Sequence, residues 1–228
     1  MTKTQIAVSE NRTLFIKNRR NPIANKTPIL KVGSNNDKLG GLIEKGIWTG
    51  MPIYSLTLEE RKTCPISCPH YSDCYGNNMR YGHRFEHGQG LESRLEIELT
   101  RLSKIHKFGF VVRLHVLGDF YNVRYVKKWE NWLKKFPNLK VFGYTGYLPN
   151  DENKNYAKIG LEILRIRIEN PQRFQIRFSN GGDLDFSANP IDKGFKGFTC
   201  PEQTGKVPTC SKCGLCWTTN KSVNFITH

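Results

Sequence analysis

Residues 108–117, with the sequence Phe-Gly-Phe-Val-Val-Arg-Leu-His-Val-Leu, form an apolar run from which the fold prediction starts. A run of this length, rich in Val, Leu and Phe, predicts a strand buried inside a sheet. It ends at the turn 118–120, Gly-Asp-Phe. In the segments on both sides, apolar residues recur every three or four positions, which is the spacing of a helix with one buried face. We therefore expect a sheet whose strands alternate with helices.

The alternation of strand and helix repeats along the chain. Strands are predicted over residues 51–58, 108–117, 140–145 and 174–179, and helices over residues 91–105, 123–136 and 152–169. Strands that alternate with helices of this length form a parallel sheet with right-handed crossovers. The prediction is an α/β fold, either a partial (βα) barrel or an open parallel sheet of about four to six strands, with a loop-rich, metal-stapled C-terminal tail.

Changes in composition divide the chain into three segments. Residues 1–40 are polar and basic, and they are predicted to form an N-terminal arm. Residues 41–185 contain the alternating pattern and are predicted to be the α/β core, which carries the first cysteines. Residues 186–228 are rich in Gly, Lys and Cys, a composition that predicts a cysteine-rich C-terminal extension without long helices or strands.

The overall charge points to a polyanionic partner. The chain of 228 residues has 35 Lys and Arg against 20 Asp and Glu, which gives a formal net charge of +15. Neutralising phosphates releases counterions, so we expect nucleic acid as a partner or substrate; a basic surface that binds no nucleic acid is the alternative. The sequence has no apolar run long enough to cross a bilayer and no secretory signal near residue 1, so no membrane partner and a cytoplasmic location are expected.

All seven cysteines fall into two groups, and their spacing predicts metal binding. The groups are Cys64, Cys68 and Cys74, and Cys200, Cys210, Cys213 and Cys216. In a reducing compartment, an odd number of closely spaced thiols favours metal ligation over disulfides. Thiolates are soft ligands that suit iron–sulfur clusters or zinc.

The two groups predict different kinds of site. Three cysteines can hold a [4Fe–4S] cluster with one iron left open, whereas a structural zinc ion would need a fourth ligand. His70 could supply that ligand, or it could be an ordinary loop residue. Four cysteines with a CxxCxxC core can complete a second site, for which a cluster is favoured and zinc is the alternative. Alternatively, one cysteine of the second group could complete the first site.

Polar residues at the ends of the predicted strands are candidates for the rest of the site. Arg113 and His115 alternate onto one face of an apolar strand, so they need either a partner or an aqueous cavity. We predict catalytic roles for Arg113, His115 and Arg177, with a structural ion pair and a buried histidine as the alternative. Asp119 could bind an amino group or cap the next helix. The residues predicted to bind a cofactor are Gly118, Asp119, Tyr144, Thr145 and Ser179.

Several of these segments resemble the "gene product eighty-eight" family of uncharacterised phage and bacterial proteins. They are residues 38–41, 50–58, 63–79 and 113–120 and the cysteine-rich tail. The resemblance covers about residues 38–217. The resemblance implies which proteins are related to this chain but no particular reaction. If the chain is encoded by a phage, it implies a location in the host cytoplasm.

More distantly, the chain is similar to radical S-adenosylmethionine enzymes. These place three cluster cysteines after the first strand and a Gly-rich acidic turn after the second, and residues 118–119 would take the place of that turn. The spacing of the first three cysteines differs from that family's CxxxCxxC, and the chain is short for its six-stranded partial barrel. The resemblance implies an iron–sulfur enzyme that uses S-adenosylmethionine and an external electron donor on a nucleic acid or nucleotide. The alternative is a metal-stapled nucleic-acid-binding module without catalysis.

Overall fold

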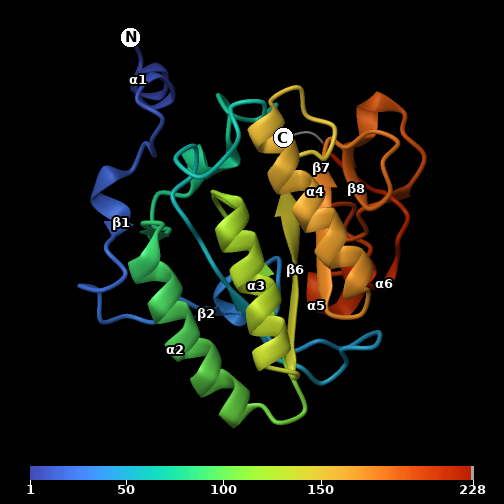
Figure 1. The fold of residues 1–228 in the computed structure, drawn as a ribbon. Coiled ribbons are helices and arrows are strands. Elements are labelled where there is room, and N and C mark those ends of the chain that lie inside the picture. The colour runs from blue at the N-terminus through green and yellow to red at the C-terminus, as the bar shows by residue number, and fades with distance from the viewer. Residues whose placement is uncertain (227–228) are drawn as a thin grey trace.

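The computed structural model describes residues 1–226 and is built around a mixed, mostly parallel sheet of eight strands (Figure 1). Their order is β2 (Lys31–Val32), β3 (Ile53–Ser55), β5 (Phe110–Leu114), β6 (Leu139–Thr145), β7 (Phe174–Ser179), β8 (Ser187–Pro190), β10 (Val223–Phe225) and β9 (Phe198–Thr199). Only β2 and β3 pair antiparallel; every other neighbouring pair is parallel. The predicted α/β class is confirmed. The predicted number of strands was too low, because short strands near both ends of the chain join the sheet, which within residues 1–226 does not close into a barrel.

Three helices cover one face of the sheet (Figure 1). They are α2 (Gln89–Ile105), α3 (Val123–Lys135) and α4 (Lys154–Glu169), close to the predicted ranges. The α2 stripe Leu91, Leu95, Leu99 and Leu102 is buried in the core that α2 and α3 form with the sheet. Helix α3 begins at a side-chain cap, because Tyr125 N donates to Asn122 Oδ1 at 2.8 Å. Among the described residues, no helix is long and apolar enough to cross a bilayer.

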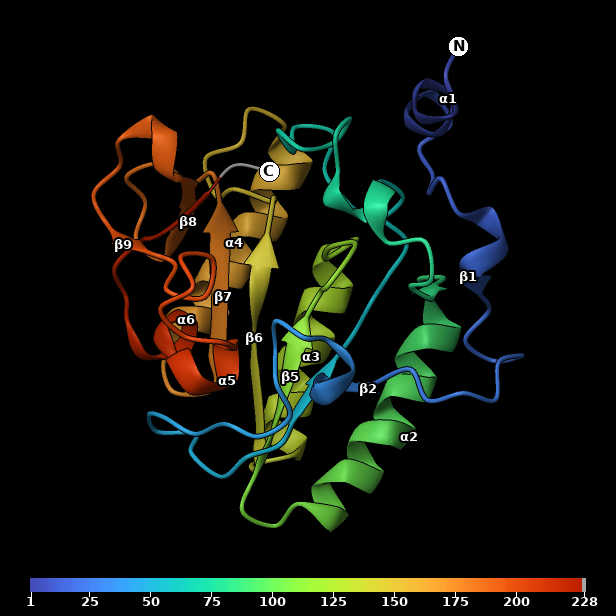
Figure 2. The same cartoon turned by 180° about the vertical axis from the view of Figure 1, so that it is seen from behind.

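The opposite face is covered mostly by irregular chain, together with the short helices α5 (Cys210–Cys213) and α6 (Leu215–Thr218) (Figure 2). Val111 and Phe142 point from the sheet into a second core that contains Trp48 and Trp217. The two tryptophan rings stack with centroids 5.5 Å apart. Segments from near residue 48 and near residue 217 therefore close this face together, although they are far apart in the sequence.

Residues 1–40 take part in the folded structure. They contain the short helix α1 (Lys3–Ser9), strand β2 of the main sheet and strand β1 (Arg19–Arg20), which pairs with β4 (Arg84–Phe85) in a separate two-stranded parallel sheet. Ile29 and Leu30 are buried in the main core. The segment predicted as an arm thus packs against the core, whereas the predicted domain boundaries stay predictions. Residues 227–228 of the predicted extension lie outside the described residues.

The C-terminal extension contains only short elements. Helices α5 (Cys210–Cys213) and α6 (Leu215–Thr218) each span 4 residues and are separated by Gly214, which has a φ of 72°. The positive φ is favourable for glycine and lets the chain turn sharply between the two helices. This turn brings the CxxCxxC cysteines onto one side of a compact loop.

Candidate metal centres

The first three cysteines, called the edge thiols below, lie in the loop after β3 at the carboxyl edge of the sheet (Figure 1). Hydrogen bonds that Thr63 accepts fix this loop to its neighbours. Asp119 N, after β5, donates to Thr63 Oγ1 at 2.9 Å, and Tyr147 Oη, after β6, donates to Thr63 O at 2.9 Å. The loops after three adjacent strands therefore meet where the edge thiols lie, as parallel topology predicts.

Asp119 joins these loops through both carboxylate oxygens. Oδ1 accepts from Phe120 N and Oδ2 accepts from Gly146 N, each at 2.7 Å. Burial raises the pKa of Asp119 to about 7, although these hydrogen bonds act in the opposite direction. Gly118 precedes it with a φ of 76°, and a Cβ there would lie 2.6 Å from Thr63 Oγ1. The predicted turn is thus a close packing point, and Asp119 is not the cap of α3, which is Asn122.

The edge thiols are partly buried and electrostatically close to one another. Burial is the largest cause that raises the pKa of each thiol, to about 11 for Cys68, and Asp119 adds to this increase at Cys64 and Cys68. Without a bound cation the thiols are therefore protonated, and a metal ion would have to displace their protons. His70 Nδ1 lies 3.6 Å from Asp73 Oδ1, and its half-exposed side chain fits the loop-residue alternative.

Buried charges that the sequence analysis did not single out shape the cysteine loop. Glu60 and Arg84 form an ion pair at 2.8 Å, with both side chains essentially inaccessible to solvent. Arg84 also donates to the carbonyl oxygens of Met79, Gly82 and Gly76.

Arg61 fixes the remaining part of the same loop. It has a φ of 64° and donates to Tyr71 O at 2.9 Å and Asn77 Oδ1 at 2.8 Å. The run Glu59-Glu60-Arg61 after an apolar strand was the only sequence feature that could have indicated these buried charges. Such a run is usually a solvated turn.

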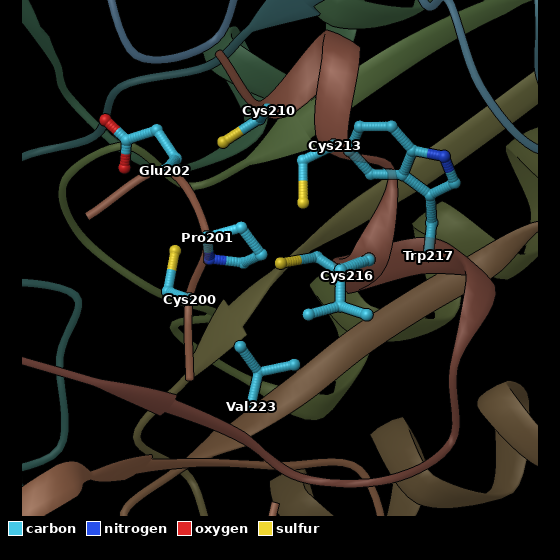
Figure 3. A pocket seen from close by; sticks show the side chains of 9 residues that line it. Cys200, Pro201, Glu202, Cys210, Cys213, Cys216, Trp217 and Val223 are labelled. Carbon is cyan, nitrogen blue, oxygen red and sulfur yellow. The ribbon is translucent and has the colours of Figure 1, made fainter. Parts of the chain in front are cut away.

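The other four cysteines, called the tail thiols below, line one small pocket. Its lining also includes Trp217, Val223 and Glu202. Figure 3 shows the four sulfur atoms pointing toward a common space from β9's end, α5 and α6. Burial raises the pKa of Cys210 to about 12 and also raises that of Cys213 and Cys216. As at the edge, these are protonated thiols that a cation would have to convert to thiolates.

The two groups of thiols lie in different parts of the molecule. The edge thiols are at the carboxyl ends of the strands, whereas the tail thiols lie on the face of the sheet opposite to α2, α3 and α4. None of the edge thiols lines the tail pocket. Within residues 1–226, no three His, Cys, Asp or Glu side chains are arranged to hold one metal ion directly.

Arg177 and Tyr144 belong to the tail pocket's surroundings and not to the edge. The fully buried Arg177 donates to the carbonyl oxygens of Cys216 at 3.0 Å and Lys221 at 2.9 Å, and also to Thr219 O. Tyr144 Oη is 3.0 Å from Cys216 Sγ. Arg177 therefore anchors the backbone that carries a tail thiol, and its side chain is not directed into a substrate pocket.

Arg113 and His115 do not share a face. Strand β5 ends at Leu114, so the alternation that placed the two residues together does not continue. His115 packs against Phe120 and lies 3.3 Å from Tyr125 Oη, in the core that contains the helices. This matches the buried-histidine alternative. The same-face prediction was wrong because the strand is shorter than its apolar run.

Arg113 points toward the face covered by the tail. Its guanidinium lies 5.8 Å from the centre of the Tyr144 ring, and its buried Nε has no hydrogen-bond partner in the described part of the chain. Arg113 also interacts electrostatically with Tyr75, which follows the edge thiol Cys74, and with the tail thiol Cys210. It is the predicted catalytic residue that the structure leaves best placed to meet a ligand.

Thr145 and Ser179 differ in their surroundings. Thr145 is buried beside Asp119, and its Oγ1 accepts from Tyr147 N at 3.1 Å, so it supports the edge loops. Ser179 ends β7 and pairs with Ala188 of β8. The predicted cofactor residues therefore separate into an edge set, Gly118, Asp119 and Thr145, and two residues elsewhere, Tyr144 and Ser179.

Comparison with known proteins gives no match: no family model, curated protein or solved structure corresponds to this chain.

Proposed function

We propose that the chain is an iron–sulfur enzyme of the radical S-adenosylmethionine type, with a three-cysteine centre at the edge and a four-cysteine centre in the tail. The observation that carries the proposal is the meeting of three thiols from the loop after β3 with the Gly118–Asp119 turn after β5. In that enzyme type, the corresponding loops hold a cluster with one open iron next to the cofactor.

The order of the strands supports the same proposal. From β3 to β8 each strand of the main sheet pairs with the next one along the chain, and the pairing is parallel. Consecutive parallel pairing is the connectivity of a partial (βα) barrel, in which ligands bind at the carboxyl ends. The finer fold that we propose is a partial barrel in which only short helices follow β7 within residues 1–226.

The tail pocket is small, and the spacing of its cysteines supports a cluster over a single zinc ion. Four thiolates that close on one zinc ion at about 2.3 Å leave no space between them. The tail thiols instead surround a cavity of about 10 Å³, roughly enough for one water-sized sphere. The sulfur atoms converge, but they are not arranged around one ion. Either group would require the tail thiols to move when it binds, so the support for a cluster over zinc is the CxxCxxC spacing of Cys210, Cys213 and Cys216.

The residues around the edge would hold and orient what binds there. When bound, the cluster and S-adenosylmethionine would supply radical chemistry with electrons from an external donor. Asp119 and Thr145 hold together the loops that carry and surround the edge thiols. Arg113, with its unpaired Nε, would bind an anionic group of the substrate between the edge and the tail.

The net charge of +15 supports a nucleic acid or nucleotide as substrate in the cytoplasm of a host cell, in keeping with the proposed relation to the phage family. The same charge favours a second candidate, a nucleic-acid-binding module in which metal only staples the fold. This alternative predicts binding that weakens steeply with salt and does not respond to S-adenosylmethionine.

The test is anaerobic purification followed by EPR of the reduced protein with and without S-adenosylmethionine. The proposal predicts a brown protein with a cluster signal that shifts when the cofactor is added. The shift should disappear in Cys64→Ala and persist in Cys213→Ala, which changes the tail. A colourless zinc protein, or a signal that ignores the cofactor in the unmodified chain, would contradict the enzyme and leave the binding module.

A further inference from the structure

A second cavity, of about 200 Å³, lies apart from both groups of thiols. It is formed by the segment around β2, by β3, and by the segment that follows the cysteine loop. Its lining residues are Ile29, Lys31, Asn35, Asn36, Ser55, Thr57, Met79, Tyr81, Gly82, His83, Phe85 and Val116. None of the cysteines is among them, so the cavity is not explained by the metal centres.

The polar lining of this cavity suits an anion. Lys31 and His83 contribute basic groups, and no carboxylate is among the described residues that line the cavity. His83 Nδ1 is buried and has no hydrogen-bond partner in the described structure. Burial, followed by the charges of Arg20 and Lys31, lowers the pKa of His83, so Arg20 acts on this ring in addition to Lys31. A bound anion would relieve their repulsion and give Nδ1 a partner.

The remaining lining suits a flat ring with polar edges. Tyr81 lines the cavity and is 94% exposed, so its ring is open to solvent at the rim and free to stack on a ligand. Phe85, Met79 and Val116 form an apolar floor. The hydroxyl groups of Ser55 and Thr57 and nearby amide side chains can hydrogen-bond to ring substituents. Aromatic rings at the rim of a basic groove are the usual platform for stacking a base.

We propose that this cavity binds a nucleotide, with its phosphate near Lys31 and His83 and its base against Tyr81. The cavity is smaller than a typical drug-sized pocket of roughly 300–1,000 Å³, so it can enclose only part of one nucleotide unit, and the base lies at the rim against Tyr81. That unit is either a free nucleotide or one nucleotide of a single strand. The site does not depend on a metal, and it would exist whether or not the chain is an enzyme.

The test is calorimetric titration of the anaerobically purified full chain with uridine 5′-monophosphate, which avoids the adenosine part of S-adenosylmethionine. Uridine, inorganic phosphate and an eight-residue oligouridylate are titrated in parallel. We expect the monophosphate to bind more tightly than uridine or phosphate alone. Tighter binding of the oligouridylate than of the monophosphate identifies a single strand as the source, and equal binding identifies the free nucleotide.

The variants Tyr81→Ala and Lys31→Ala should each weaken binding of the monophosphate at least about fivefold. Matched controls are Phe108→Ala, a 98% exposed ring at the other end of the sheet, and Lys104→Ala on the exposed side of α2; both should bind as the unmodified chain does. Replacing all three edge thiols by alanine should leave binding unchanged, which separates this site from the proposed enzyme. Absence of binding at millimolar ligand, or equal losses in the variants and their controls, would overturn the proposal.

Discussion

The two groups of cysteines present the same residue type in contrasting surroundings. The edge thiols lie in a loop held by buried charges, chiefly the Glu60–Arg84 ion pair and the Asp119 carboxylate. The tail thiols pack beside aromatic rings. Tyr144 Oη contacts Cys216 Sγ, and Trp217 of α6 lies in the same apolar core as Cys216. Polar, preorganised loops at a sheet edge are typical of functional sites, whereas thiols in an apolar layer are typical of a structural staple. Under the proposed function, the edge would serve chemistry and the tail would serve stability.

The largest expected effect separates the two groups by stability. In Cys210→Ala with Cys216→Ala, the tail would lose the proposed metal centre, which would hold the layer over the sheet, and the melting temperature should fall by more than about 10 °C. In Cys64→Ala with Cys68→Ala, we expect the response to S-adenosylmethionine to be lost with a much smaller fall. Anaerobic scanning calorimetry measures both variants. Equal falls in melting temperature would show that the contrast does not exist.

The next effect concerns the buried ion pair of the edge. Arg84→Met leaves Glu60 buried without a counter-ion, and the free energy of unfolding should decrease by about 3–5 kcal/mol. Lys134→Met is the matched control, because Lys134 is exposed and Glu130 keeps its ion pair with Arg165, so the change should cost at most about 1 kcal/mol. Urea unfolding followed by circular dichroism gives both values. Similar losses for the two variants would rule out a special role for the buried charges.

A smaller effect should appear as pH dependence. Burial lowers the pKa of His115 to about 3, below the value of about 6.5 in an unfolded chain. The unfolded chain therefore binds a proton first, so His115 makes the protein less stable as the pH falls from about 6.5 toward 3. Between pH 7.5 and 5.5 this loss should amount to about 1 kcal/mol.

Urea unfolding of His115→Gln at these two pH values checks this expectation. The variant should lose less stability on acidification than the unmodified chain. The half-exposed His70, replaced in the same way, is the control and should behave as the unmodified chain does. If His115→Gln loses as much stability as His70→Gln, the histidine is not held neutral.

The smallest effect concerns one hydrogen bond at the tail. Tyr144→Phe removes the hydroxyl that lies 3.0 Å from Cys216 Sγ, at a cost of about 1 kcal/mol or less. A hydrogen bond to a ligand sulfur stabilises the reduced, more negative state, so its loss should lower the reduction potential of the tail centre. Redox titration followed by EPR measures this. Tyr54→Phe, which loses a hydrogen bond to His106, is the control and should leave both potentials unchanged.

The helices and central strands were predictable because their signals are local. The stripe of leucines in α2 and the apolar run of β6 form their elements almost within the predicted limits. The end of β5 was not predictable in this way. The run continues to Leu117, but ladder pairing with β6 ends at Leu114, so a contact between distant segments decides where His115 points.

The grouping of the thiols was predictable from the sequence, whereas the residues that hold them in place were predictable only in part. The spacing of the cysteines identified two groups, and strand order predicted that the edge thiols would lie near Asp119. The positions of Tyr144 and Arg177 beside the tail depend on how residues 200–225 fold back over the sheet. No local pattern encodes that return. Arg61 and Arg84 were missed because a charged run beside a loop usually indicates solvent exposure.

The most direct test of two separate centres is the content of iron and acid-labile sulfide after anaerobic purification. It should be measured in the unmodified chain, in a variant without the edge thiols and in a variant without the tail thiols. The account predicts about eight irons in the unmodified chain and about four in each variant, as expected for independent [4Fe–4S] clusters. Zinc without iron, thiols paired as disulfides, or loss of all iron in either variant would contradict it.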